Sequence, residues 1–232
     1  MVLPGTAQHS ATVSNSMKID FVSDVSCPWC VIGLKALEQA LATLPELTAE
    51  IEFQPFELNP AMPPEGQDIA EHLTEKYGAS PAQAAATREA IRQRGAELGF
   101  SFVPGARSRI YNTFDAHRLL HWAYEQSPAQ QRALKMALFA AYFTDGQDPS
   151  NHAVLLTAAL SASLDAAGAQ AVLASDAYSA EVRAAQALYR QHGINAVPAV
   201  IINNKHLISG GQPVDVFVQA LRQIAAETGS AA

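Results

Sequence analysis

The segment SDVSCPWCVIGLKALE, residues 23–38, contains the only two cysteines of the 232-residue chain, Cys27 and Cys30. Two thiols at this spacing can form a redox couple, contribute to a metal site or close a short structural disulfide. A structural zinc site needs about four ligands, and the sequence offers neither a second C-x-x-C nor a histidine close by. A disulfide across so short a loop removes little entropy from the unfolded chain. The redox interpretation is favoured over the other two.

The residues that flank the pair predict a strand before it and a helix after it. Residues 18–23 have strand character, and residues 31–44 have apolar side chains at spacings of three and four, which is typical of one helix face. Cys27 then lies at the start of the helix, where unpaired N–H groups and the helix dipole favour an anion. A thiolate there is the attacking species, and Cys30, one turn later, can resolve a mixed disulfide.

Two further residues of this segment are candidate substrate contacts. Pro28 suits the first turn of a helix, where its missing N–H breaks no hydrogen bond. Trp29 is a large apolar side chain beside the thiols. It is either an exposed contact for a peptide substrate or a packing residue, and the sequence leaves both interpretations open.

The other expected strands lie near the two ends of the chain. Residues 49–56 follow the first helix as a second strand. Residues 199–202 and 206–209 flank a short polar link and predict a hairpin, and a final helix is expected over 213–228. This order places sheet-forming segments at both ends and helical patterns between them.

The chain therefore divides into three expected parts. Residues 1–16 are expected to be a disordered leader. Residues 17–57 and 193–229 are expected to form one discontinuous α/β domain around a common sheet. Residues 58–192 have helical patterns rich in alanine and leucine and no convincing strand, so they predict an all-helical insertion.

A proline stands directly before the third expected strand, in GINAVPA, residues 193–199. Proline cannot donate to a sheet ladder, and an X–Pro bond takes the cis form at modest cost. A cis Val197–Pro198 bond would present the backbone N–H and C=O of Val197 to an extended peptide, which could pair with them as an added strand. The alternative is a trans proline that begins the strand. The C-x-x-C upstream favours the cis form.

Four segments together resemble the DsbA-like branch of the thioredoxin superfamily, and most closely its FrnE-type dithiol–disulfide oxidoreductases. They are SDVSCPWCVIG, PFELNPAMPPEG, NTFDAHRLLHWA and GINAVPAVIINNKHLISGGQP, spread over residues 23–213. The resemblance implies a thioredoxin fold in which a large all-helical insertion separates a βαβ amino-terminal part from a ββα carboxyl-terminal part. It also implies that Cys27 is the nucleophilic thiol, Cys30 the resolving thiol and Pro198 a cis-proline that faces them.

Two other functions compete with thiol–disulfide exchange. Kappa-type glutathione transferases and hydroxychromene-carboxylate isomerases share the inserted fold but usually have serine at the position of Cys27. Asn59 and the turn at residues 210–212 could still form a pocket for glutathione as a co-substrate. A client-binding chaperone, in which the groove matters and the thiols do not, is the third hypothesis.

Five polar residues are weaker candidates. Asp24, three residues before Cys27, could act on the thiol or accept a proton, and a solvated loop carboxylate is the favoured interpretation. His117 and His121 have a metal-ligand spacing, but the sequence HRLLH lacks the internal glutamate of a zinc hydrolase, which favours packing roles. Asp115 and Arg118, with His117, could line a groove above the thiols.

Composition limits the expected partners. The net charge of −7 argues against nucleic acid, and the apolar stretches are too short to span a membrane. Residues 1–16 lack the positive start and apolar core of a signal peptide, so a cytoplasmic location is expected. We expect thiol or disulfide substrates, either proteins or small molecules, and an external redox partner. No tightly bound cofactor or metal is expected beyond a redox-active Cys27–Cys30 disulfide.

Overall fold

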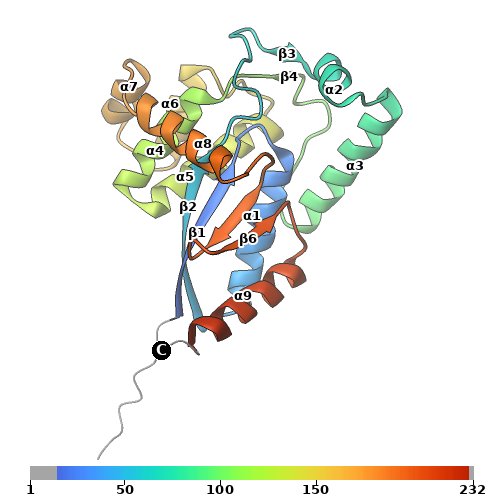
Figure 1. Ribbon diagram of the computed structural model, residues 1–232. Helices are drawn as coiled ribbons and strands as arrows, with labels where there is room; N and C mark the ends of the chain where they lie inside the picture. Colours follow the sequence, from blue (N-terminus) through green and yellow to red (C-terminus); the bar gives the residue numbers. More distant parts are fainter. Residues whose placement is uncertain (1–14, 230–232) are drawn as a thin grey trace, which may run out of the picture.

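A four-stranded mixed sheet lies at the centre of the computed structural model, which describes residues 15–229 (Figure 1). Its strands have the order β2-β1-β5-β6. They are β1 (Asn15–Ser23), β2 (Leu47–Pro55), β5 (Ala199–Ile202) and β6 (His206–Ser209). Strand β1 pairs parallel with β2 and antiparallel with β5, so segments from the two ends of the chain form one sheet. The expected α/β thioredoxin fold is confirmed.

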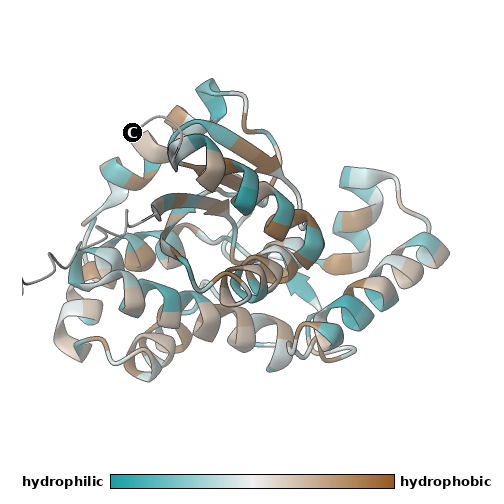
Figure 2. Cartoon of the chain, turned by 90° about the horizontal axis from the view of Figure 1, so that it is seen from below, coloured by the Kyte–Doolittle hydropathy of each residue, from teal (hydrophilic) through white to brown (hydrophobic). Residues whose placement is uncertain are grey.

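Helices α1 (Pro28–Ala42) and α9 (Val214–Gly229) pack against each other beside the sheet. Helix α1 is the crossover that a parallel pair of strands requires. Its apolar face and the sheet form a core in which Phe21 and Phe53 meet edge to face, with ring centres 5.8 Å apart. Figure 2 shows hydrophobic residues concentrated on the strands, with hydrophilic residues on the outer sides of the surrounding helices.

The segment between β2 and β5 is predominantly helical, as expected. Its helices are α2 (Ile69–Tyr77), α3 (Pro81–Glu97), α4 (Phe114–Gln126), α5 (Pro128–Phe139), the π-helical turn η1 (Ala140–Thr144), α6 (His152–Ser161), α7 (Ala166–Leu173) and α8 (Ser179–Gln191). Helices α2 and α3 lie on one side of the molecule, and α4 to α8 lie on the other (Figure 1). Helices α4, α5 and α8 contact β2. Within residues 15–229, no helix combines the length and apolarity that a membrane span requires.

Two details of the expected architecture are wrong. The insertion is not all-helical, because β3 (Gln67–Asp68) and β4 (Arg109–Ile110) form a small antiparallel sheet. Two residues per strand are too few to produce an alternating pattern. Strand β1 begins at Asn15, inside the expected leader, because its register continues until Asn15 faces Leu47 of β2. The rest of that leader lies outside the described residues.

The outer edge of β2 is paired by a side chain of the insertion. At Phe53 the Gln131 side chain accepts a hydrogen bond from the backbone N–H at 2.9 Å and donates one to the backbone C=O at 3.0 Å. Gln131 lies on α5 and is buried. The amide thereby occupies the place of a neighbouring strand at this position, which fixes α5 against the sheet.

We expect Gln131→Ala to lower the free energy of unfolding by about 2–5 kcal/mol. The substitution leaves two buried backbone groups unpaired, and each costs about 1–3 kcal/mol. Urea unfolding measures the change, with an unchanged m-value as the check on two-state behaviour. The control is Gln93→Ala, which removes one exposed hydrogen bond to Glu89 and should change stability by less than about 0.5 kcal/mol. Equal effects in the two variants would contradict the prediction.

Candidate active site at the start of helix α1

The two cysteines lie where the sequence predicts, at the first turn of a helix that follows a strand. Cys27 is the N-cap residue of α1, Pro28 is its first residue, and the Cys30 N–H donates to the Cys27 carbonyl at 3.1 Å. Both are free thiols, and Cys30 is fully buried, whereas Cys27 is 4% exposed. Trp29 is 36% exposed, so about a third of its side chain is available at the surface.

The Val197–Pro198 turn faces Cys27 across the fold. Its peptide bond is cis, the isomer that the sequence favours. The Cys27 Sγ donates a hydrogen bond to the Val197 carbonyl at 3.6 Å. Gly33 makes this approach possible, because a Cβ there would lie 3.0 Å from Pro198 Cγ and 3.3 Å from Gly211 Cα. No role was predicted for Gly33. A glycine in the first turns of a helix was the one sequence feature that could have indicated this close approach.

Asp24 is buried, so the prediction that it is a solvated loop carboxylate is wrong. It is 1% exposed, and its Oδ2 accepts a hydrogen bond from the Leu58 N–H at 2.7 Å. Its Oδ1 lies 3.5 Å from His117 Nε2. Burial acts to raise the pKa of Asp24, but the interactions with His117 and the Leu58 N–H outweigh burial and hold that pKa below its ordinary value.

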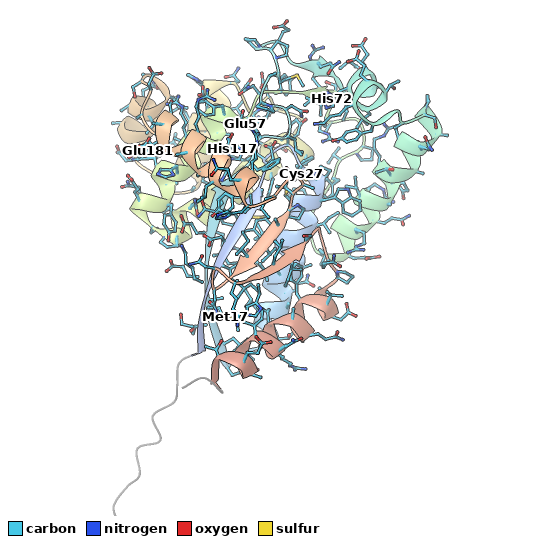
Figure 3. The ribbon with its side chains drawn as sticks, in the orientation of Figure 1. Met17, Cys27, Glu57, His72, His117 and Glu181 are labelled. Carbon is cyan, nitrogen blue, oxygen red and sulfur yellow. The ribbon has the colours of Figure 1, made fainter. Side chains whose placement is uncertain are left out.

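His117 belongs to a buried polar cluster that extends away from Cys27. Figure 3 shows Cys27, His117 and Glu57 at the same end of the sheet, with Met17 at the other end. Glu57 is buried, its Oε2 accepts a hydrogen bond from Gln186 Nε2 at 3.1 Å, and burial raises the pKa of Glu57. The favoured packing role of His117 is therefore incomplete, because its ring also stabilises the Asp24 carboxylate.

The remaining weak candidates do not join the thiols. His121 packs its ring against Tyr178, with ring centres 5.2 Å apart. Arg118 donates to Asp115, to one carbonyl in the last turn of α7 and to two carbonyls after that helix, so it ties helices of the insertion together. Asn59 accepts a hydrogen bond from Lys76 Nζ at 2.7 Å. Among the described residues, no group of three or more His, Cys, Asp or Glu side chains could hold a metal ion.

Lys135 of α5 is a buried lysine that the sequence analysis did not single out. It is fully buried, and its Nζ lies 5.1 Å from the ring centre of Phe139 and 5.9 Å from that of Phe53. Burial lowers the pKa of Lys135 to about 8, against the opposing effect of Cys30, Asp24 and Cys27. Its sequence signal was weak, because a lysine on an apolar helix face commonly extends its amine to solvent.

Lys135 in turn affects the pKa of Cys30, which is also fully buried. Burial raises the pKa of the Cys30 thiol well above its ordinary value, and Cys27 raises it further. The positive charge of Lys135 and the backbone N–H of Asp24 act in the opposite direction. Cys30 is therefore a weak acid whose ionisation is favoured by these two groups.

A cavity of about 260 Å³ opens beside the cysteine pair, at Pro28. Its other lining residues come from α3, the start of α2, residues 102–107 and η1. They include apolar side chains, three arginines and one glutamate, namely Ile69, Ile91, Phe102, Val103, Pro104, Phe143, Arg88, Arg92, Arg107 and Glu89. The cavity is thus largely apolar with a net positive rim, in a chain whose net charge is −7.

Comparison with known proteins agrees with this geometry. Residues 18–222 match the DSBA-like thioredoxin domain family. The chain belongs to this family. It is 36% identical to a protein from Streptomyces coelicolor described as a "probable DsbA oxidoreductase", whose crystal structure superposes with a TM-score of 0.83 and 89% coverage of each chain.

Two other similarities are more distant. The uncharacterized protein YwbO of Bacillus subtilis is 26% identical over 207 residues, which cover 89% of this chain and 96% of YwbO. A 2-hydroxychromene-2-carboxylate isomerase structure is 12% identical, with a TM-score of 0.68 and coverage of 93% of this chain and 99% of that one. At that identity the likeness concerns the fold alone.

The arrangement in this DSBA-like domain gives its two thiols different access. Cys27 lies at the surface end of α1, beside a cavity and an exposed tryptophan. Cys30 faces the core, with Lys135 and Asp24 as its charged neighbours. Cys27, at 4% exposure, is therefore the more accessible of the two thiols, and Cys30 has no exposed surface.

We expect Lys135→Met to raise the free energy of unfolding of the reduced protein at pH 7 by roughly 1–4 kcal/mol. Folding lowers the pKa of Lys135 from 10.5 to about 8, so the unfolded chain binds more protons between these values. The cost is full below the folded pKa and disappears as pH rises through the unfolded one. The advantage of the variant should therefore shrink between pH 7 and about pH 10.5.

Urea unfolding at these two pH values measures the effect. Lys35→Met is the matched control, because Lys35 is a partly exposed lysine on α1 that lies 3.9 Å from Glu38. It should change stability by less than about 0.5 kcal/mol at either pH. A gain in Lys135→Met that is the same at both pH values would contradict the prediction, since it would not come from the charge.

Proposed function

We propose that the chain is a thiol–disulfide oxidoreductase of the FrnE type, with Cys27 as nucleophile and Cys30 as resolving thiol. The observation that carries the proposal is the difference between them: Cys27 caps α1 beside Val197, and Cys30 lies one turn deeper, fully buried. Cys27 thus lies at a helix N-terminus, beside backbone N–H groups that have no partner within the helix.

The reaction proceeds in two exchanges. The Cys27 thiolate attacks a substrate disulfide, a Cys27–substrate S–S bond forms, and the first substrate sulfur leaves as a thiolate that takes a proton from solvent. Cys30 then attacks Cys27 Sγ, which releases the second substrate sulfur and leaves the Cys27–Cys30 disulfide. The substrate gains two electrons, and an external dithiol reduces the pair again. The reverse sequence oxidises a dithiol substrate.

We propose that the cavity beside Pro28 holds the part of the substrate that flanks its reacting sulfur. Arg92 is neutralised by Glu89, whose oxygens accept from its guanidinium at 2.6 and 2.8 Å. Arg107 lies over the rings of Tyr142 and Phe143. Arg88 has no acidic partner among the described residues, so a substrate with a carboxylate near its disulfide fits this rim.

A glutathione-dependent isomerase or transferase is the second candidate. The positive cavity supports it, because glutathione carries two carboxylates and would place its thiol near Cys27. Such a reaction needs no resolving thiol. Turnover with glutathione and an aromatic electrophile that persists in Cys30→Ala would favour it over thiol exchange.

Substitution of each cysteine tests the leading proposal. Cys27→Ser should reduce insulin-disulfide reduction by at least about 10³-fold, because an alcohol does not replace the thiolate nucleophile. Cys30→Ala should instead accumulate a mixed disulfide at Cys27, which mass spectrometry of the intact protein detects. Insulin reduction by Cys27→Ser at the parent rate would refute the proposal.

Arg88→Ala tests the substrate assignment. We expect kcat/KM to fall about 3–10-fold for a peptide disulfide with glutamates beside the cysteine, since one charge-assisted contact is lost. The neutral glutamine version of the peptide should be unaffected. Arg222→Ala is the control, because Arg222 is exposed on α9 and does not line the cavity. Equal losses for both peptides would show that Arg88 does not bind the carboxylate.

A further inference from the structure

Lys135 places a positive charge in the core without a structural partner for it. Within residues 15–229, only two buried side-chain polar atoms lack a hydrogen bond, His117 Nε2 and Lys135 Nζ. The His117 nitrogen lies 3.5 Å from the Asp24 carboxylate. Lys135 has only the faces of two phenylalanine rings near its amine. A buried ammonium in such surroundings lowers stability, so packing does not account for its presence.

The fold holds this amine beside the apolar cluster that contains the cysteine pair. Gln131 holds α5 against β2 at Phe53, and Lys135 follows one helical turn later on the same face. Its Nζ lies over Phe53 and Phe139, which belong to the apolar cluster that also contains Cys27 and Cys30.

The charged groups around Lys135 are those of the active site. Cys30 of α1, Asp24 of the loop before α1 and Cys27 act electrostatically on Lys135, and each raises its pKa against the effect of burial. Beyond Asp24 lie His117 of α4 and Glu57 after β2. Glu52 of β2 lies 3.2 Å from Lys18.

We propose that Lys135 is a positioning residue for the resolving thiol, Cys30. The Lys135 ammonium stabilises the Cys30 thiolate that attacks the mixed disulfide. This inference rests on the proposed function. In that step the Cys30–Cys27 bond forms and the Cys27–substrate bond breaks. The departing substrate thiolate takes up the proton that Cys30 loses, and Lys135 keeps its own proton throughout.

A fully buried thiol needs such a group. The core disfavours the Cys30 thiolate, and no solvent reaches it to compensate. A nearby cation acts strongly in an apolar environment, where charges are weakly screened. Lys135 thus offsets, for one step of the reaction, the burial that keeps Cys30 inaccessible to other disulfides.

Reaction with 5,5′-dithiobis(2-nitrobenzoate) separates the two steps in the full-length protein. Attack by Cys27 releases one thionitrobenzoate, and resolution by Cys30 releases a second. Stopped-flow absorbance from about pH 5 to about pH 10 gives a rate profile for each step, and Cys30→Ala identifies the first because it releases only one equivalent.

In Lys135→Met we expect the pH midpoint of the second step to rise by about one unit, which leaves about tenfold less Cys30 thiolate at pH 7. A more basic thiolate is about threefold more nucleophilic, so the resolution rate at pH 7 falls about threefold. The midpoint of the first step should move by much less. Lys135→Gln provides the same test if the methionine variant does not fold.

Lys35→Met is the matched control, because it removes a lysine charge that is partly exposed on α1 and lies 3.9 Å from Glu38. It should leave the midpoint of the second step unchanged. An unchanged second step in Lys135→Met, or an equal shift in Lys35→Met, would overturn the role of Lys135. Absence of the first release from the wild-type protein would instead refute the proposed function, so the two failures are distinguishable.

Discussion

The site depends on the close approach of two segments that are about 170 residues apart, the first turn of α1 and the Val197–Pro198 turn. Gly33 and Gly211 have no side chains to separate these backbones, and a Cβ on Gly33 would already press on Pro198. The approach requires β5 to lie beside β1, so the terminal segments must assemble before the cysteine pair has its surroundings. Sheet order, helix placement and chemistry follow from this one contact.

The helices of the insertion supply several of the side chains that surround the site. Helix α4 contributes His117 to Asp24, and α5 contributes Gln131 to the edge of β2 and Lys135 to the region behind the thiols. Helix α8 contributes Gln186 to Glu57. A sheet with α1 and α9 alone would leave the edge of β2 unpaired and Asp24 without its stabilising histidine. The helical segment therefore supplies part of the surroundings of the two cysteines.

The sequence predicts well the features that depend on neighbouring residues and those that a proline marks. The C-x-x-C at a helix start follows from the spacing of apolar residues after it, and Pro198 is conspicuous before a short apolar strand. The burial of Asp24 was not predictable, because it depends on a backbone N–H that follows β2 and a ring from α4. Strands β3 and β4 escaped detection because pairs of two residues have no periodicity.

The burial of Lys135 is the feature that the sequence predicts least well. A lysine amid leucines on a helix predicts a long side chain that reaches solvent, and only the docking of α5 by Gln131 removes that route. Burial disfavours both the Lys135 ammonium and the Cys30 thiolate. Each of these two charges makes the other less unfavourable. This mutual dependence explains how a buried thiol can remain closed to solvent yet ionise when a mixed disulfide forms one turn away.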